Sequence, residues 1–424
     1  MEAEKMLLPC GSNNLHIDDV CIDWTGLSLE AERLLGSAAQ FAGLRVMFAI
    51  SDIKTALAAV VYGMIHELDW GVIELSRVNN FLRTSFTEAG VTLINVSNGE
   101  SVGVPPDLGE VVPGRITVMT SGTTGNSKLI AHSPATLNTF NRARSLPPNL
   151  WFVPYQLGTY AWYQMVMLGL FMPMQHLALG DSSDLAHSFE KVLSKHKVTA
   201  ISSTPTFWRH ILMSIDEETI THAPLLSISL GGEVVDQAIL DRLSALYPDA
   251  CIRHIYASSE SGSAIVVSDG RAGFDRMILD QPDRTIQIKI SQGRLFVRSP
   301  FGQLLSEGEW IDTGDLVAIR GERVHFLGRA NGEMVNVGGQ KAFPADIQAL
   351  LLGHPSVLWA QVTGRRAPMV GQLPSASVVL SVQMDACTAE VMLIAYCAES
   401  LPDYAIPRFW DFPLSVPLGA SLKS

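Results

Sequence analysis

Thr117-Val-Met-Thr-Ser-Gly-Thr-Thr-Gly-Asn-Ser-Lys128 is the stretch of this 424-residue sequence on which the interpretation of the remainder depends. Residues 115–119 are apolar enough for a buried strand, and a loop of hydroxyl side chains and glycines follows them. Glycines let successive backbone N–H groups point one way, while hydroxyl groups and a lysine add further donors. Such a loop suits a phosphate group. The residues expected to form it are Thr120, Ser121, Gly122, Thr123, Thr124, Gly125 and Lys128.

The loop sequence allows two other interpretations. One is a polar surface loop that merely follows a strand. The other is a Walker loop, which requires a lysine directly after its second glycine and then Ser or Thr. Here Ser127 precedes Lys128 and Leu129 follows it, so the Walker pattern is not met.

Composition narrows the class of protein. The chain is longer than one ordinary core needs, which predicts two domains, and 47% apolar residues argue against disorder. A net charge of −12 disfavours non-specific nucleic-acid binding, which needs a basic surface. The five cysteines include no CxxC pair, and no charged-then-apolar leader opens the sequence. These features predict a cytoplasmic protein without a metal scaffold or a disulfide framework.

One long stretch, residues 145–180, contains no Asp, Glu, Lys or Arg and is in principle long enough to span a bilayer. It is interrupted by Pro147, Pro148, Pro154 and Pro173. Its longest uninterrupted apolar run, Met165 to Met174, has the length of a buried core segment. We therefore expect no membrane span.

Strand and helix patterns alternate over the first two thirds of the chain. The expected strands are residues 45–50, 70–75, 91–96, 175–179, 200–203, 226–230 and 252–256, and the expected helices are 53–65 (capped by Asp52), 78–89, 185–196, 207–213 and 235–246. This alternation predicts an α/β fold with doubly wound, mainly parallel sheets that bind ligands outside the carboxyl ends of their strands.

The pattern changes near Asp280. Short alternating runs separated by turn residues predict an antiparallel β subdomain with strands at 285–290, 294–297, 316–319 and 324–327. A small α+β unit is expected next, with strands at 334–337, 357–362 and 377–380 and helices at 345–352 and 389–400. We therefore predict a large N-terminal domain, 1–329, and a small, mobile C-terminal domain, 330–424.

The loop sequence Thr-Ser-Gly-Thr-Thr-Gly-x-x-Lys resembles the phosphate loop of the acyl-adenylate-forming superfamily, which includes acid–CoA ligases, adenylation domains of peptide synthetases, and luciferases. Further segments resemble that family in the expected order. The first is Leu230-Gly-Gly-Glu233, and the resemblance implies that the backbone of Gly231, Gly232 and Glu233 lies against the adenine of ATP. A Gly-rich turn from strand to helix is the alternative.

The next segment, Ile255-Tyr-Ala-Ser-Ser-Glu260, resembles the family's Tyr-Gly-x-Thr-Glu. The resemblance assigns the ring of Tyr256 to adenine, the hydroxyl of Ser259 to the α-phosphate and the carboxylate of Glu260 to Mg²⁺. Ala257 replaces the usual glycine, and Ser259 replaces the usual threonine. The alternative is an ordinary helix cap.

The third segment is Trp310-Ile-Asp-Thr-Gly-Asp315. Two neighbouring ribose hydroxyls need an acceptor that takes two hydrogen bonds, which a carboxylate provides. The resemblance assigns this role to Asp315, with Arg329 nearby. The alternative is an aspartate that serves only a β-turn.

The last two segments resemble the hinge and the C-terminal signature of the family. The hinge position is Asn331, where Asp or Lys is usual, and the spacing to Gly338-Gly339 is one residue longer. Lys423 falls where a lysine reaches between the substrate carboxylate and the α-phosphate, although Gly419 and Leu422 depart from the signature. The alternative for Lys423 is a solvated chain end.

The resemblance implies an enzyme that uses ATP and Mg²⁺ to convert a small carboxylic acid to acyl-AMP, releasing pyrophosphate, and then passes the acyl group to the thiol of CoA or of an acyl carrier protein. The resemblance assigns catalytic roles to Lys128, Glu260 and Lys423. Residues 157–164 lack a carboxylate, which favours an aryl or other hydrophobic acid, although their aromatics suit a packed core equally well.

Two alternatives to thiol transfer remain at this stage: an amine acceptor, and a relative that binds nucleotide or carboxylate without turnover. Full-length relatives carry more residues before the phosphate loop, so a shortened first subdomain with an acid pocket open on one side is expected.

Overall fold

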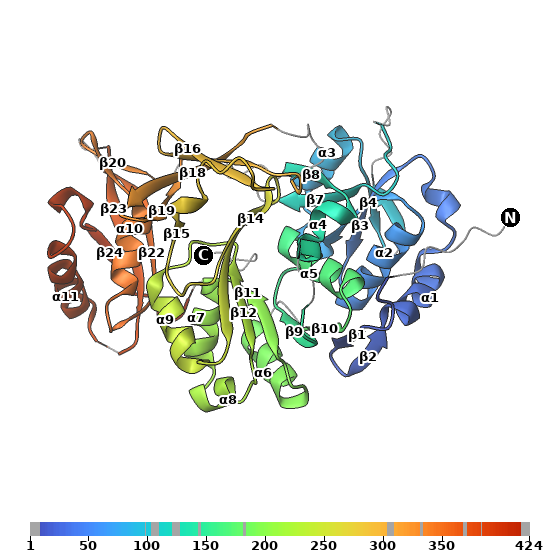
Figure 1. Ribbon diagram of the computed structural model, residues 1–424, viewed down its shortest axis with the longest axis horizontal. Helices are drawn as coiled ribbons and strands as arrows, with labels where there is room; N and C mark the ends of the chain where they lie inside the picture. The colour runs from blue at the N-terminus through green and yellow to red at the C-terminus, as the bar shows by residue number, and fades with distance from the viewer. Residues whose placement is uncertain are drawn as a thin grey trace.

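The computed structural model describes residues 9–97, 99–102, 110–120, 128–142, 146–180, 184–302, 309–330, 334–367, 371–382 and 384–416. Its larger part is built on two sheets (Figure 1). The first, which we call sheet A, has eight strands and is parallel except at its two edges. In spatial order its strands are β14 (Gly262–Val267), β13 (Cys251–Ser258), β12 (Ser227–Gly231), β11 (Ala200–Ser203), β9 (Asn149–Val153), β10 (Gln175–Leu179), β1 (Asn14–Ile17) and β2 (Val20–Asp23).

The second sheet, sheet B, has six strands, of which the inner four are parallel. In spatial order they are β6 (Glu100–Val102), β5 (Thr92–Asn95), β3 (Arg45–Ile50), β4 (Asp69–Glu74), β7 (Ile116–Thr120) and β8 (Lys128–His132). Both faces of β3 are buried: Val46 and Phe48 belong to one hydrophobic cluster, and Met47 and Ala49 to another. A strand buried on both faces reads as a continuous apolar run, which is why its limits are predictable.

Helices cover both faces of both sheets. The layer between the sheets consists of α1 (Trp24–Leu35), α2 (Ile53–Ile65) and α5 (Tyr160–Phe171), whose side chains share one cluster with residues of both sheets. The outer face of sheet A carries α6 (Leu185–Lys195), α7 (Pro205–Ser214) and α9 (Gln237–Leu246). The outer face of sheet B carries α3 (Asn80–Glu88). Two short helices, α4 (Pro134–Leu137) and α8 (Glu217–Thr221), complete this part.

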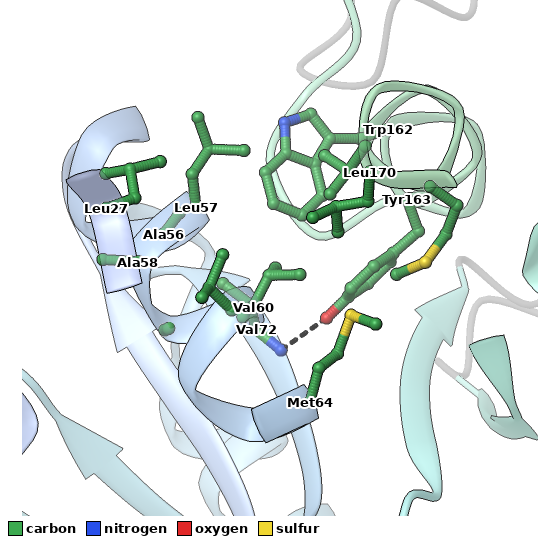
Figure 2. Close-up of a cluster of buried hydrophobic side chains, with 14 of the residues drawn as sticks. Leu27, Ala56, Leu57, Ala58, Val60, Met64, Val72, Trp162, Tyr163 and Leu170 are labelled. Atoms are coloured by element: carbon green, nitrogen blue, oxygen red, sulfur yellow. Dashed lines mark hydrogen bonds between the residues drawn. The ribbon is translucent and has the colours of Figure 1, made fainter. Parts of the chain in front are cut away.

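Helices α1, α2 and α5 of the middle layer pack against both sheets. Asp52 caps α2 as predicted, accepting a hydrogen bond from the backbone N–H of Thr55 at 2.8 Å. Tyr163 of α5 is fully buried, and its hydroxyl accepts a hydrogen bond from the N–H of Val72 in β4 at 2.7 Å (Figure 2). Just before α5, Gly158 has φ +75°, and a side chain there would collide with the carbonyl of Val72. Only glycine fits that close approach at that backbone angle.

Two smaller sheets follow in the chain. Sheet C is antiparallel, with the order β15 (Phe274–Asp275), β19 (Arg323–Arg329), β18 (Ile311–Arg320), β17 (Arg294–Arg298) and β16 (Gln287–Ser291). Sheet D contains β21 (Gln340–Ala342), β20 (Val335–Val337), β23 (Gly371–Leu380), β22 (Val357–Ala367) and β24 (Phe409–Asp411). It packs against α10 (Pro344–Leu352) and α11 (Ala386–Ala398).

Contacts that sheet D and its helices make with the preceding parts include a salt bridge and a small hydrophobic cluster. Arg320, at the end of β18, forms a 2.7 Å salt bridge with Asp346 in α10. Trp359 of β22 is 2% exposed and packs in a small cluster with Met213 of α7.

The predicted fold class is confirmed by this architecture, and all expected strands and helices are present, most with small shifts at their ends. The larger differences are in β18 and β23, which begin five and six residues earlier than expected, and in β22, which ends five residues later. The N-terminal hairpin β1–β2 was not predicted. It joins sheet A through parallel pairing of β1 with β10, far from its neighbours in sequence. Within the described residues, no helix is both long and apolar enough to cross a bilayer; the charge-free stretch folds largely as β9, α5 and β10.

Candidate active site

The carboxyl ends of the parallel strands carry several of the residues predicted to bind ligand. In sheet A, Gly231 ends β12 and Tyr256 lies near the end of β13; in sheet B, Thr120 ends β7. Tyr155 and Thr204, which were not predicted, follow β9 and β11 at the same edge of sheet A. Ligands of open α/β sheets bind at this edge, because loops from neighbouring strands meet there. Thr120 is half-buried at the end of β7 and pairs with Lys128, which is exposed at the start of β8.

Asp315 is the centre of the best defined polar cluster. It is 7% exposed and forms a 3.0 Å salt bridge through Oδ1 with Nε of Arg329, its partner across β18 and β19. The hydroxyl of Tyr256 donates to Oδ2 of the same carboxylate. Arg329 also donates to the carbonyl of Thr313 at 2.7 Å. The structure thus brings together three residues that the sequence placed in one nucleotide site.

Tyr256 is held from two sides. Its ring stacks on Phe326 of β19 at 4.8 Å between centroids, with an interplanar angle of 21°. Burial raises the pKa of the Tyr256 hydroxyl, and the Asp315 carboxylate raises it further, so the hydroxyl stays protonated and donates its hydrogen bond. Stacking of this ring on adenine remains a prediction; the structure shows that one of its ring contacts is with Phe326.

Ser259 and Glu260 follow β13. Ser259 is buried, and its hydroxyl donates to the Glu260 carboxylate at 3.2 Å. Gly302 lies against this turn so closely that a side chain there would collide with the carbonyl of Glu260. The turn is therefore fixed by packing of one backbone on another.

The donor set is compatible with Mg²⁺. Among the described residues, no group of three or more His, Cys, Asp or Glu side chains could hold a metal ion. Mg²⁺ is usually held by one or two carboxylates together with phosphate oxygens, and a single carboxylate such as Glu260 meets that requirement.

Glu233 has a structural contact that the sequence did not predict. Its carboxylate accepts hydrogen bonds from the N–H and the hydroxyl of Thr206, at 3.1 and 2.8 Å, and so caps the first turn of α7. Beside it, the hydroxyl of Tyr155 lies 3.0 Å from that of Ser202. Burial raises the pKa of Tyr155, and the Glu233 carboxylate adds to the rise. Tyr155 and Ser202 were missed because no motif marks them; their positions at strand ends were the available signal.

A buried histidine near the candidate site was not predicted from the sequence. His132, at the end of β8, is 0% exposed; its Nδ1 lies 3.1 Å from the hydroxyl of Thr136 and its ring 5.3 Å from that of Tyr160. Burial lowers the pKa of His132 to about 4, and the backbone of Ser259 opposes this only in part. The imidazole is therefore neutral at physiological pH.

The aromatics near the predicted acid pocket divide into two groups. Trp162 and Tyr163 are fully buried between the sheets (Figure 2), as the packed-core alternative requires. Tyr160 is half-buried at the start of α5. Some predicted positions lie outside the described residues: Ser121, Gly122, Thr123, Thr124, Gly125, the hinge Asn331 and Lys423.

Comparison with known proteins agrees with this geometry. The AMP-binding enzyme family matches residues 116–311, and the AMP-binding enzyme C-terminal domain matches residues 346–423. The chain is similar to the 2-succinylbenzoate–CoA ligase of Bacillus velezensis, with 25% identity over 379 residues that cover 81% of this chain and 75% of that protein. A second ligase of this name, from Bacillus subtilis, is 26% identical over 72% of this chain and 66% of its own length.

Solved structures share the fold. One is the o-succinylbenzoate CoA synthetase of Bacillus subtilis in complex with its acyl-adenylate intermediate, with a TM-score of 0.70 and 19% identity over 96% of this chain and 93% of that one. Another is the amide bond synthetase McbA of Marinactinospora thermotolerans, with a TM-score of 0.74 and 16% identity over 97% and 95% of the two chains. Together with the two family matches, these likenesses show that the chain belongs to the acyl-adenylate-forming superfamily of AMP-binding enzymes.

Proposed function

We propose that this chain is an AMP-forming acid–CoA ligase that activates a carboxylic acid with ATP, releases pyrophosphate and transfers the acyl group to CoA. The proposal is supported by the Asp315 cluster, in which Arg329 and Tyr256 hold the carboxylate to which the family resemblance assigns the ribose of ATP. A carboxylate offers about four acceptor positions, so contacts with these two side chains are compatible with bonds from ribose hydroxyls.

The likeness to 2-succinylbenzoate–CoA ligases supports both the acid and the acceptor. Those proteins are named for an aryl dicarboxylic acid and for CoA. An aryl acid agrees with residues 157–164, which include no carboxylate. We therefore propose an aryl acid, with 2-succinylbenzoate as the first candidate to test.

The chemistry has two steps. In the first, an oxygen of the substrate carboxylate attacks the α-phosphorus of ATP, and the bond to the departing pyrophosphate breaks. Lys128 would hold the leaving phosphates, and Lys423 would sit between the carboxylate and the α-phosphate. In the second, the thiol of CoA attacks the acyl carbon, loses its proton, and AMP departs. Positive charge placed before the reaction favours the first step, because an anion attacks a polyanion.

Glu260 would hold Mg²⁺ against the nucleotide phosphates, and Ser259 would contact the α-phosphate. When bound, Mg²⁺ neutralises negative charge on the phosphate oxygens of ATP. Gly231, Gly232 and Glu233 would lie along adenine by their backbone, while the Glu233 side chain keeps α7 in place. The loop residues Thr120, Ser121, Gly122, Thr123, Thr124 and Gly125 would bind the phosphates.

The division at about residue 330 remains part of this proposal, with 1–329 as the large domain and 330–424 as the small one. The second step in this family uses a rotation of the small domain about the hinge, and here Asn331 occupies that position. A reducing, cytoplasmic location is proposed because all five cysteines are free thiols.

Pyrophosphate release with a panel of acids tests the proposal. We expect release with 2-succinylbenzoate or another aryl acid, and consumption of the activated acid by CoA. Acyl carrier protein and hydroxylamine serve as alternative acceptors and test whether the enzyme delivers to a carrier or to an amine. Absence of acid-dependent pyrophosphate release with every acid would show that the chain does not perform the first step.

Two variants test the assigned roles. Lys423→Ala should lower the rate of adenylation by about 10²- to 10³-fold and leave ATP binding largely intact, because the donor acts at the reacting centre. Asp315→Asn should raise the KM for ATP by about 10- to 100-fold, as expected for loss of a charge-assisted hydrogen bond. Unchanged pyrophosphate exchange in the first variant, or an unchanged KM for ATP in the second, would contradict the role concerned.

A further inference from the structure

Arg77 is a half-buried cationic residue at the ligand-binding edge of sheet B. It ends the short helix η2 (Leu75–Arg77), which follows β4 directly. Because Trp70 pairs in parallel with Ile116, strands β4 and β7 end at the same level, at Glu74 and Thr120. Leu75 and Val78, which flank Arg77, pack against a hydrophobic cluster that includes Met119 of β7. The segment that carries Arg77 therefore lies beside the strand from which the phosphate loop departs.

The guanidinium of Arg77 is incompletely paired. Its Nη1 atom is buried and, in the part of the chain that the structure describes, has no hydrogen-bond partner. Glu74 is nearby, but its two oxygens accept hydrogen bonds from neutral donors: Oε1 from the hydroxyl of Ser76 at 2.7 Å and Oε2 from Nε2 of Gln156 at 2.8 Å.

An incompletely paired guanidinium such as that of Arg77 lowers the stability of the folded chain. Burial lowers the pKa of Arg77, which means that the site disfavours the charged form, and Glu74 offsets this only in part. A buried polar group is normally satisfied, and a donor without a partner is expected where a ligand completes the pairing. Planar guanidinium groups bind carboxylates and phosphates through two parallel hydrogen bonds.

We propose that Arg77 binds an oxyanion of one of the substrates of the ligase reaction. This inference rests on the proposed function, because it takes the ligand from that reaction. The oxyanion has two possible sources with the same chemistry: a second carboxylate on the acid, or a phosphate of ATP or CoA. The link from Glu74 to Gln156 connects Arg77 to the segment that leads into α5, which was predicted to wall the acid pocket.

Steady-state kinetics of the full chain can separate these sources. Arg77→Met removes the charge, Arg77→Lys keeps it without the planar fork, and Arg242→Gln serves as the matched control. Arg242 lies in α9 and pairs with Glu217 at 2.6 Å on the surface. The KM values for 2-succinylbenzoate, for benzoate, for ATP and for CoA are compared in each variant.

We expect Arg77→Met to raise the KM for one substrate by about 10- to 100-fold, the range expected when a charge-assisted hydrogen bond is lost. A rise for 2-succinylbenzoate but not for benzoate assigns the second carboxylate, and a rise for ATP or CoA assigns a phosphate. Arg77→Lys should recover part of the loss. KM values equal to those of the control, or a uniform fall in kcat with a lower Tm, would overturn the proposal.

Direct binding distinguishes failure of this inference from failure of the proposed function. If the wild-type chain releases no pyrophosphate with any acid, the ligase assignment fails, and Tm shifts with inorganic pyrophosphate, 2-succinylbenzoate and CoA then decide on Arg77. A Tm rise with one probe that is lost in Arg77→Met but kept in Arg242→Gln supports oxyanion binding. An equal rise in all variants, or none with any probe, overturns it.

Discussion

The two ends of sheet B differ in how completely their charged side chains are paired. At the amino end, Asp69 is buried and accepts two hydrogen bonds from Arg115 and one from the N–H of Val112 at 3.0 Å, with Arg45 at 3.8 Å. At the carboxyl end, Arg77 keeps a buried nitrogen atom without a partner among the described residues. Saturated pairing at one end serves stability, and incomplete pairing at the other leaves room for a ligand.

The largest expected effect is at the amino end. Asp69→Asn removes a buried charge that two half-buried arginines share, and breaking a buried pair of this kind costs about 3–5 kcal/mol of unfolding free energy. Chemical denaturation measures the loss, and Arg77→Met, which removes an incompletely paired charge, is the matched comparison. Equal losses of unfolding free energy in the two variants would show that pairing at the two ends of sheet B does not differ in its effect on stability.

A second test uses pH. His132 pairs with Ile116, at the amino end of β7. Its pKa is about 4 in the folded state against 6.5 for an ordinary histidine. The unfolded chain therefore takes up a proton first, and stability should fall as the pH drops below 6.5 towards 4. The expected loss between pH 7 and pH 5 is about 2 kcal/mol from this residue.

Denaturant titrations of the wild type and His132→Gln at the two pH values measure this contribution. The variant should be less stable at pH 7, because a packed ring is lost, and its stability should depend less on pH. An identical pH dependence in the two proteins would show that His132 does not titrate as its burial implies.

The smallest expected effect is at the carboxyl end. Gln156→Ala removes the amide that occupies one oxygen of Glu74, leaving the carboxylate able to pair with Arg77. Competition for the guanidinium should weaken oxyanion binding several-fold, which corresponds to about 1 kcal/mol. The same KM measurements check this, with little change in Tm. A tighter rather than weaker KM would contradict the arrangement.

The fold was largely predictable because its elements carry strong local signals. Residues 46–50 of β3 form an unbroken apolar run, and Asp52 provides a visible cap for the helix after it. The hairpin β1–β2 lacked such a signal. Its strands are short and contain polar residues, and it is stabilised by pairing with β10, more than 150 residues away, which no local pattern reports.

Residues of the candidate site could be grouped from the sequence only where a motif marks them. The structure brings together Asp315, Arg329 and Tyr256, and their role in binding nucleotide stays a prediction. Arg77 and Tyr155 stand in no motif, and their importance depends on which strands lie side by side. The order of strands in a sheet follows from long-range packing, so side chains at neighbouring strand ends could not be grouped from the sequence.

The fluorescence of Trp359 depends on whether its indole is buried or exposed to water. Trp359 is enclosed where β22 meets α7, beside Met213. The salt bridge between Arg320 in β18 and Asp346 in α10 is a separate contact between the same two parts of the chain. The proposed turn of the small domain about residue 330 would separate these partners and expose the indole to water. Its fluorescence would then shift to longer wavelength during turnover, and raised ionic strength, by weakening the salt bridge, would favour the open arrangement.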